Sequence, residues 1–178
     1  MKRLSAILIL IAALLSPIAL AARTTEVSVS YGIAPAMRSL GAYHHGWHQL
    51  DNWGAVNATI DHSFAPNLWV GLSYTYSSSQ SDHALANRYG KIVYHGLMAN
   101  VRYHWWNHGP VSLYSHVGIG ALVQYFTPSW EDSYNRNTMA FQVSPVGIEF
   151  NPLPSLGLFG EVGYGVQGIA KVGIRLGF

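Results

Sequence analysis

The sequence predicts an all-β protein, folded as an eight-stranded antiparallel up-and-down transmembrane β-barrel. Apolar residues recur at every second position over most of the chain after residue 24, which is the period of a strand rather than a helix. Charged residues make up only 10% of the chain, against roughly 25% in typical soluble domains. Short turns also alternate with long polar connections, as they do in transmembrane barrels.

The composition limits what else the chain can be. Its 178 residues are the length of one domain. A surface so poor in charge would aggregate in water, so a membrane or a partner must cover it. The net charge of +2 comes without a basic block, so nucleic-acid binding is not indicated. Cysteine is absent, which excludes disulfides and thiolate metal sites, and we expect no cofactor.

The first 21 residues have the three parts of an export signal. Lys2 and Arg3 form the positive region, residues 4–15 the apolar region, and residues 19–21 an A-x-A cleavage site. The apolar run of about a dozen residues is shorter than the roughly 20 that a membrane-spanning helix needs. We therefore expect residues 1–21 to be a cleavable signal peptide and residues 22–178 to form the barrel.

The mature region divides into eight alternating segments. In each, one face is apolar and the other carries mostly Gly, Ser, Thr and Asn. A soluble sandwich would instead turn a face rich in Lys, Glu and Arg to water, whereas small residues suit the narrow interior of an eight-stranded barrel. The alternation changes phase at Pro145, which predicts a β-bulge. The segments cover residues 27–33, 56–64, 68–77, 93–104, 111–125, 141–150, 156–166 and 170–178.

The connections predict an orientation. Those near residues 65–67, 106–110 and 151–155 are short, and those near 35–52, 78–88 and 127–137 are long. Bacterial barrels have short periplasmic turns and long outer loops, so we expect an outer-membrane location with both termini in the periplasm. Aromatic residues occur near both ends of the predicted strands, where transmembrane barrels carry an aromatic girdle at each membrane interface. They are Phe64, Tyr103, Trp105, Trp106, Phe150 and Phe178 on the turn side, and Tyr74, Tyr76, Tyr89, Tyr125 and Phe126 on the loop side.

The C-terminal residues 171–178 (KVGIRLGF) resemble the targeting signal of outer-membrane barrels, with Gly173, Leu176 and Phe178 at its characteristic positions. Residues 141–178, including PVGIEF and GEVGYG, resemble the small outer-membrane β-barrel proteins abundant in Bacteroidetes and, more distantly, the OmpA and OmpX type barrels. The resemblance implies the barrel fold, the outer-membrane location and recognition by the barrel-assembly machinery. It implies little about activity.

Charged residues on the polar faces predict ion pairs inside the barrel. If Gly168 centres a three-residue loop, Glu161 lies opposite Arg175 and Gly165 lies opposite Lys171. Such charges could form a gate or a proton path, but an eight-stranded barrel has no aqueous bore, so we favour a plug of paired charges. The candidates are Asp61, Arg102, Glu149, Glu161, Lys171 and Arg175.

Histidines raise two further possibilities. His44, His45 and His48 form a weak metal-site candidate, because imidazoles bind zinc or copper but Asp51 is the one acidic residue near them. His95 falls on the lipid face, where outer-membrane lipid A deacylases use a His with a Ser and a carboxylate. No Ser or carboxylate shares that face at that depth, so we treat His95 as a residue of the membrane interface.

We therefore predict a non-enzymatic outer-membrane barrel. It contacts outer-membrane lipid and lipopolysaccharide, and three long loops, carrying Trp47, Trp53, Trp130 and Tyr134, are available for adhesion or ligand contact. A lipid A-modifying enzyme and a narrow passive pore are the alternatives.

Overall fold

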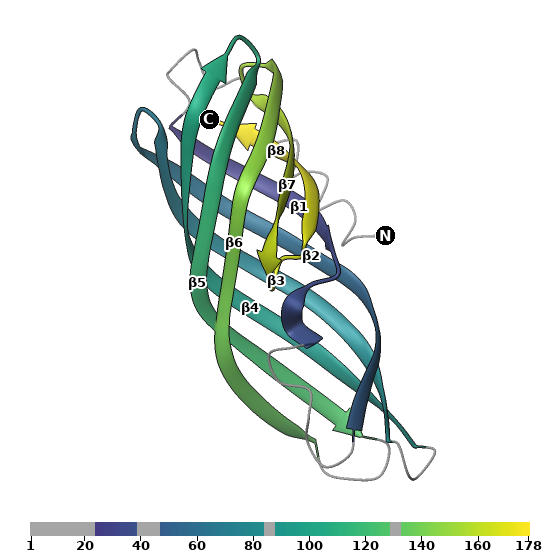
Figure 1. Ribbon diagram of the computed structural model, residues 1–178. Coiled ribbons are helices and arrows are strands. Elements are labelled where there is room, and N and C mark those ends of the chain that lie inside the picture. The colour runs from purple at the N-terminus through teal and green to yellow at the C-terminus, as the bar shows by residue number, and fades with distance from the viewer. Residues whose placement is uncertain (1–23, 39–46, 84–87, 129–132) are drawn as a thin grey trace, which may run out of the picture.

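The computed structural model describes residues 24–38, 47–83, 88–128 and 133–178, so the predicted signal peptide, His44, His45 and Trp130 lie outside the described residues. Eight strands close into an antiparallel barrel in which each strand pairs with its neighbours in sequence and β8 pairs with β1 (Figure 1). The predicted fold class is confirmed. The strands are β1 (Thr25–Ile33), β2 (Trp47–Ala65), β3 (Leu68–His83), β4 (Arg88–His108), β5 (Val111–Pro128), β6 (Tyr134–Leu153), β7 (Leu156–Gly165) and β8 (Ala170–Gly177), with a short 3-10 helix, η1 (Ala36–Arg38), after β1.

Both ends of the described chain take part in closure. β1 pairs with β8 from Glu26↔Gly177 to Ile33↔Ala170. Beyond the last strand residue, the Phe178 amide donates to the Thr25 carbonyl at 2.8 Å, and the Phe178 carbonyl accepts from the Thr24 amide at 2.9 Å. The terminal aromatic residue is therefore part of the seam. A closed ladder leaves no edge of unpaired backbone at that level, which a hydrocarbon environment requires.

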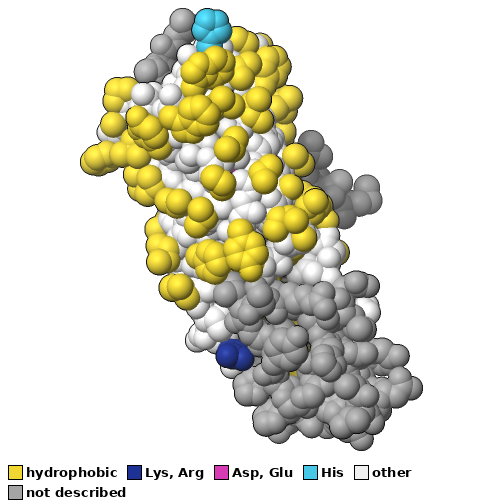
Figure 2. All heavy atoms as spheres, viewed as in Figure 1, with side chains coloured by type: hydrophobic (Ala, Val, Ile, Leu, Met, Phe, Trp, Pro, Cys, Tyr) yellow, Lys and Arg dark blue, Asp and Glu magenta, His cyan; other side chains and the backbone are white. Residues whose placement is uncertain are grey.

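The outer wall is apolar. Side chains alternate between buried and exposed along each strand, and the exposed set includes Ile60, Leu72, Leu97, Ile119 and Val172. Figure 2 shows hydrophobic side chains spread over the upper part of the face in view, beginning at the short-turn end at the top. Among all side chains that the structure describes, one Asp, Glu, Lys or Arg is exposed, and that is Lys91. The described helix is too short and too polar to cross a membrane.

Register shifts interrupt several of the strand pairs, and two of them bear on the faces expected from the sequence. Between Val143 and Val146 the β6–β7 register shifts, so the bulge predicted at Pro145 is confirmed. A second shift between His104 and Trp106, which the alternation did not indicate, turns both Trp105 and Trp106 outward, with about half of each side chain exposed. These indoles strengthen the aromatic girdle at the short-turn end.

The strands have two distinct lengths. β1, β7 and β8 contain 9, 10 and 8 residues, close to the 9–11 or so that a tilted strand needs to span a bilayer. β2 to β6 contain between 16 and 21 residues. As Figure 1 shows, these five strands continue well past the β7–β8 turn. Beyond the closed barrel, β2 to β6 therefore continue as an open five-stranded sheet. We call this part the projecting sheet.

The strand extensions correct the loop boundaries expected from the sequence. Residues 47–52, 78–83, 88, 127–128 and 134–137 were expected in long loops but belong to strands. Beyond the apolar band both faces of a strand can be polar, so the alternation disappears although the hydrogen-bond ladder continues. The connections between strands are shorter than expected, and the outward projection is mostly β-sheet.

Candidate functional site

The interior of the barrel contains all six charged residues predicted there. The structure places their side chains in the lumen, and each of the six residues is at most 6% exposed. The described lumen also holds Glu26, His104 and His116. From the short-turn end outward, the interior consists of an ion-pair layer, a neutral polar layer and an apolar layer.

Two arginines organise the first group of charges, which we call the Arg102–Arg175 cluster. Arg102 forms an ion pair with Glu26, and its Nη1 lies 3.4 Å from Asp61 Oδ2. Arg175 pairs with Glu149, and its Nε lies 3.3 Å from Glu26 Oε2. The Glu26 carboxylate thus touches both guanidinium groups. His104 Nε2 approaches the same Glu149 oxygen at 3.6 Å. This cluster links β1, β2, β4, β6 and β8 across the lumen.

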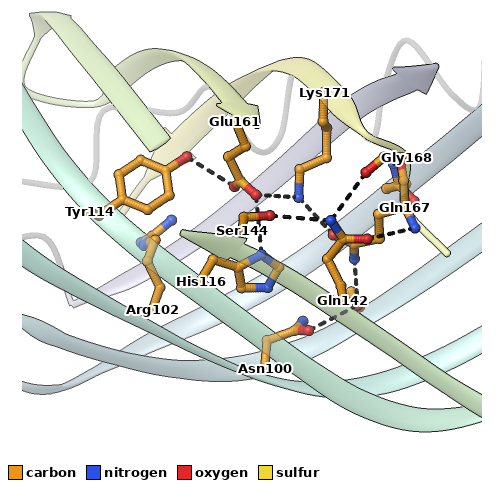
Figure 3. Close-up of polar contacts among 12 residues, drawn as sticks. Asn100, Arg102, Tyr114, His116, Gln142, Ser144, Glu161, Gln167, Gly168 and Lys171 are labelled. Carbon is orange, nitrogen blue, oxygen red and sulfur yellow. Dashed lines mark hydrogen bonds and ion pairs between the residues drawn. The ribbon is translucent and has the colours of Figure 1, made fainter. Parts of the chain in front are cut away.

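The Glu161 cluster lies next to it and is shown in Figure 3. Glu161 Oε1 accepts a hydrogen bond from the Tyr114 hydroxyl at 2.9 Å. Its Oε2 lies 2.9 Å from Lys171 Nζ and 3.1 Å from His116 Nδ1. A buried carboxylate with three partners of this kind is well compensated for its lost hydration.

The predicted pairing of the last hairpin is wrong. Glu161 lies opposite Lys171 rather than Arg175, and Arg175 lies opposite Gly157. The last pair before the turn is Val162↔Ala170, so the connection is longer than the three residues that the prediction assumed. The cause is the turn itself, which bends into the lumen instead of closing tightly above it. Gly168, at φ +120°, adopts a backbone conformation there that favours glycine.

Aromatic rings support the cations from the sides. The Arg175 guanidinium lies 4.4 Å from the centroid of Phe159 and 5.5 Å from that of Tyr114. The Arg102 guanidinium lies 5.1 Å from Trp69. These are cation–π distances. Gly147 makes room for the Tyr114 ring, because a Cβ at this position would collide with it.

The β7–β8 turn enters the polar layer above the charges, where Gln167 meets polar side chains of the strands (Figure 3). Gln167 is fully buried, and its Oε1 accepts a hydrogen bond from Lys171 Nζ at 2.6 Å. Its Nε2 donates to Ser73 Oγ, which in turn donates to Asn100 Oδ1. Gln142 holds the turn, since its Oε1 accepts from the Gln167 amide and its Nε2 donates to the Gly168 carbonyl. The turn thus forms a septum across the lumen.

Apolar side chains fill the level beyond this septum. Met37 of η1 and Val166 of the turn are fully buried there. Phe126, which the sequence placed in the outer girdle, is also inside, with 5% exposure. It lies inside because β5 turns its even-numbered residues inward along its whole length. The cluster consists of Met37, Ile92, Tyr94, Met98, Leu122, Phe126, Ala140 and Val166.

The outer end of the apolar wall carries a continuous aromatic belt. Tyr31, Trp53, Tyr76, His95 and Tyr125 follow one another around the barrel with ring centroids 5.5 to 6.4 Å apart. Trp53 was expected in a loop but belongs to this belt, because β2 continues past it. Its indole donates to Ser78 Oγ at 3.0 Å.

His95 is half-buried among tyrosines. Its Nδ1 lies 2.6 Å from the Tyr74 hydroxyl, and the rings of Tyr76 and Tyr125 meet it edge to face. Within the described residues, no partner of His95 is a serine or a carboxylate. Among these residues no group of three or more His, Cys, Asp or Glu side chains is placed to hold a metal ion, and the side chain of His48 is outside the described set.

The three residues of the predicted assembly signal lie in β8 or directly after it. Gly173 pairs with Ser30, and a Cβ there would crowd both Ser30 and the Phe159 ring. Leu176 pairs with Val27 of β1. Their recognition by the barrel-assembly machinery stays a prediction.

Several lumen residues were missed by the sequence reasoning. Glu26 shares the inward face with Ser28 and Ser30, and that alternation could have identified it. Trp69 and Phe159 were missed because large aromatic residues are expected on the outer wall of a barrel rather than in its lumen. Gln167 carries no sequence signal, since it occupies a turn expected to point into solvent.

No family model matches the chain, and no curated protein matches it either. Solved structures of small outer-membrane barrels do. The Yersinia pestis attachment invasion locus protein Ail, solved in complex with the heparin analogue sucrose octasulfate, is 20% identical with a TM-score of 0.47, covering 86% of this chain and 96% of Ail. The N-terminal β-barrel domain of Pseudomonas aeruginosa OprF is 12% identical with a TM-score of 0.49, covering 88% and 98%. Ail in a phospholipid bilayer nanodisc is 19% identical with a TM-score of 0.43, covering 86% and 99%. The resemblance to Bacteroidetes barrels stays a prediction.

Proposed function

We propose that this chain is a non-enzymatic barrel of the bacterial outer membrane, closed to ions, whose projecting sheet contacts a ligand outside the cell. The observation that carries the proposal is the difference in strand length. Three strands are just long enough to cross a bilayer, while β2 to β6 are up to twice that length. The additional residues of β2 to β6 are not needed to cross the bilayer. They therefore form a sheet that projects beyond the membrane, where it can contact a ligand.

The apolar wall and the aromatic belts support the location. An exposed apolar band between two aromatic girdles is the exterior of a transmembrane barrel. The described termini, Thr24 and Phe178, lie at the short-turn end, which is the periplasmic end in this proposal. An N-terminal export signal accounts for the route there.

The projecting sheet has two free edges that suit ligand contact. β1 pairs with β2 no further than Ala55, and β7 pairs with β6 no further than Gln142. Among the described strands, residues 47–52 and 134–140 therefore have a partner on one side only, because the Trp53 and Phe141 carbonyls already accept hydrogen bonds from the Tyr31 hydroxyl and the Val166 amide. Open edges expose backbone donors and acceptors that accept an extended peptide as an additional strand. A polypeptide ligand is the class that this geometry fits.

The lumen supports a closed barrel rather than a pore. The ion-pair layer, the Gln167 septum and the apolar cluster follow one another along the axis, and each fills the cross-section with side chains of several strands. Purified protein in planar lipid bilayers is therefore expected to show no discrete conductance. Discrete conductance steps at neutral pH would contradict a closed lumen and would show that the barrel is a passive pore.

The surroundings of His95 favour a structural role over lipid A modification. Its ring nitrogen is engaged by a tyrosine, and an acyl-transfer site requires a nucleophile and an orienting acid beside the base. Incubation of the folded protein with purified lipid A, followed by mass spectrometry, is expected to return unchanged lipid. A deacylated or acyl-transferred product would establish the enzyme instead.

A phage library of random peptides tests ligand contact. Panning against the protein in lipid nanodiscs is expected to enrich extended, β-prone peptides over empty nanodiscs. Lysines on the exposed edge of β6, in the double variant N135K/N137K, should abolish the enrichment, because charged edge residues block strand addition. The control variant Q80K/T127K adds the same charge to β3 and β5, which have a neighbouring strand on both sides. This variant should retain the peptide enrichment. No enrichment, or equal loss in both variants, contradicts edge recognition.

A further inference from the structure

A small cavity lies between the Arg102–Arg175 cluster and the Glu161 cluster. It has room for about one water molecule. Groups from both clusters line it, together with two hydroxyl side chains and one aromatic ring. The lining residues are Ser28, Thr59, Asp61, Arg102, His116, Phe159, Glu161, Lys171 and Arg175.

Two residues with unused hydrogen-bonding capacity, Asp61 and Arg102, meet at this cavity. Asp61 has one described charge partner, Arg102 Nη1 at 3.4 Å, and no described group donates a hydrogen bond to it. Within the described residues, Arg102 Nη1 and Nε likewise find no hydrogen-bond acceptor, although the side chain is 2% exposed. A buried charged group without its hydrogen bonds loses the hydration it had in the unfolded chain and gains nothing in return.

The balance of charge decides what kind of ligand fits. The described lumen contains four carboxylates, on Glu26, Asp61, Glu149 and Glu161, and three cations, on Arg102, Lys171 and Arg175. An anion would add to an existing excess of negative charge. A metal cation would have to displace guanidinium and ammonium groups that already bind these carboxylates. A neutral molecule that both donates and accepts fits the contacts without changing the charge.

We propose that the cavity binds one water molecule. It accepts a hydrogen bond from the Arg102 guanidinium and donates one to the Asp61 carboxylate. The His116 ring, whose Nδ1 lies 3.1 Å from Glu161, supplies the further partner that a buried water needs, and the Ser28 and Thr59 side chains complete the wall. The water joins the two clusters into one network from Glu149 to Lys171, so the closed lumen is held by a continuous set of hydrogen bonds. This inference is independent of any ligand on the projecting sheet.

Crystals of the mature protein grown in sodium bromide test the proposal directly. The expected result is one peak of electron density within 3.2 Å or so of Asp61 and Arg102, with no anomalous signal of bromine. A bromine signal in the cavity would overturn the proposal in favour of an anion site. Absence of density, with Asp61 and Arg102 hydrogen-bonded directly, would overturn it as well.

A matched pair of variants supplies a second readout by NMR of the protein in detergent micelles. Cross-relaxation between a long-lived water and the His116 ring protons is expected in the wild type. It should persist in D61N, which keeps the acceptor oxygen, and disappear in D61L, which removes it at similar size. Folding of each variant is checked by its heat-dependent gel mobility. A wild-type spectrum without this cross-relaxation contradicts a resident water whether or not D61L folds.

Discussion

Gln167 Nε2, in the β7–β8 turn, donates a hydrogen bond at 3.0 Å to Ser73 Oγ on β3, 94 residues earlier in the chain. In strand order β3 lies on the opposite side of the barrel from β7 and β8. A turn that a simple hairpin would leave in solvent therefore spans the lumen. This bond, with those to Lys171 and Gln142, separates the charged layer from the apolar layer.

A double-mutant cycle on this pair measures the strength of the septum. Q167A and S73A should each lower the free energy of unfolding by about 1–3 kcal/mol, because each leaves a buried polar group without its partner. The double variant should lose less than the sum, with a coupling of about 0.5–1.5 kcal/mol. Urea titrations in lipid vesicles, followed by tryptophan fluorescence, provide the values. Strict additivity would mean that the side chains do not bond across the lumen.

Replacing each of the two lysines of the described strands by methionine should change the free energy of unfolding by very different amounts. K171M leaves Glu161 buried without its cation and is expected to lower the free energy of unfolding by about 3–5 kcal/mol. K91M removes an exposed charge and should change it by less than about 0.5 kcal/mol. The same urea titration compares them. Equal effects would contradict the placement of Lys171 inside.

Two glycines test the packing of the Tyr114 ring. G147A places a methyl group against that ring and should cost about 1–3 kcal/mol. At Gly160 the nearest atoms to an added Cβ are 3.8 Å or more away, so G160A should be nearly neutral. Unfolding midpoints of the two variants give the comparison. If G147A is as stable as G160A, the ring does not occupy the position described.

The lipid face can be tested with a single charge. Ile119 is 61% exposed and lies midway along the apolar wall, so I119R should lower stability by about 2–4 kcal/mol in a bilayer. Q80R, on an outward position beyond the aromatic belt, should have little effect. If I119R is tolerated as well as Q80R, that wall does not face hydrocarbon.

The sequence was sufficient for the strands of the closed barrel and insufficient for the strand extensions beyond it. From Val27 to Ile33 and from Ala170 to Phe178, an apolar outer wall on one side and a packed lumen on the other impose strict alternation, and every face was predicted correctly. Residues 78–80 lost that signal because polar side chains stand on both faces of the strand, the buried Ser79 included. Phe126 was misplaced for the related reason that the interior becomes apolar at its level.

The lumen contacts depended on three-dimensional information that the alternation does not contain. Alternation placed Glu161, Lys171 and Arg175 inside, since a period of two assigns the face. It could not assign their partners, because the partner depends on the length of the turn. The inward bend at Gln167 moved Glu161 from Arg175 to Lys171, and no residue pattern in Val166–Ile169 indicates that bend.

Gel mobility of the protein extracted from purified outer membranes, with and without boiling, tests the central claim most directly. A closed barrel embedded in that membrane resists unfolding by detergent at room temperature and should migrate at a different position from the boiled chain. A heat-dependent shift in the outer-membrane fraction is therefore the result we expect. Identical mobility, or recovery of the protein from the soluble periplasm, would mean that the apolar wall is covered by protein and that the chain is not a membrane barrel.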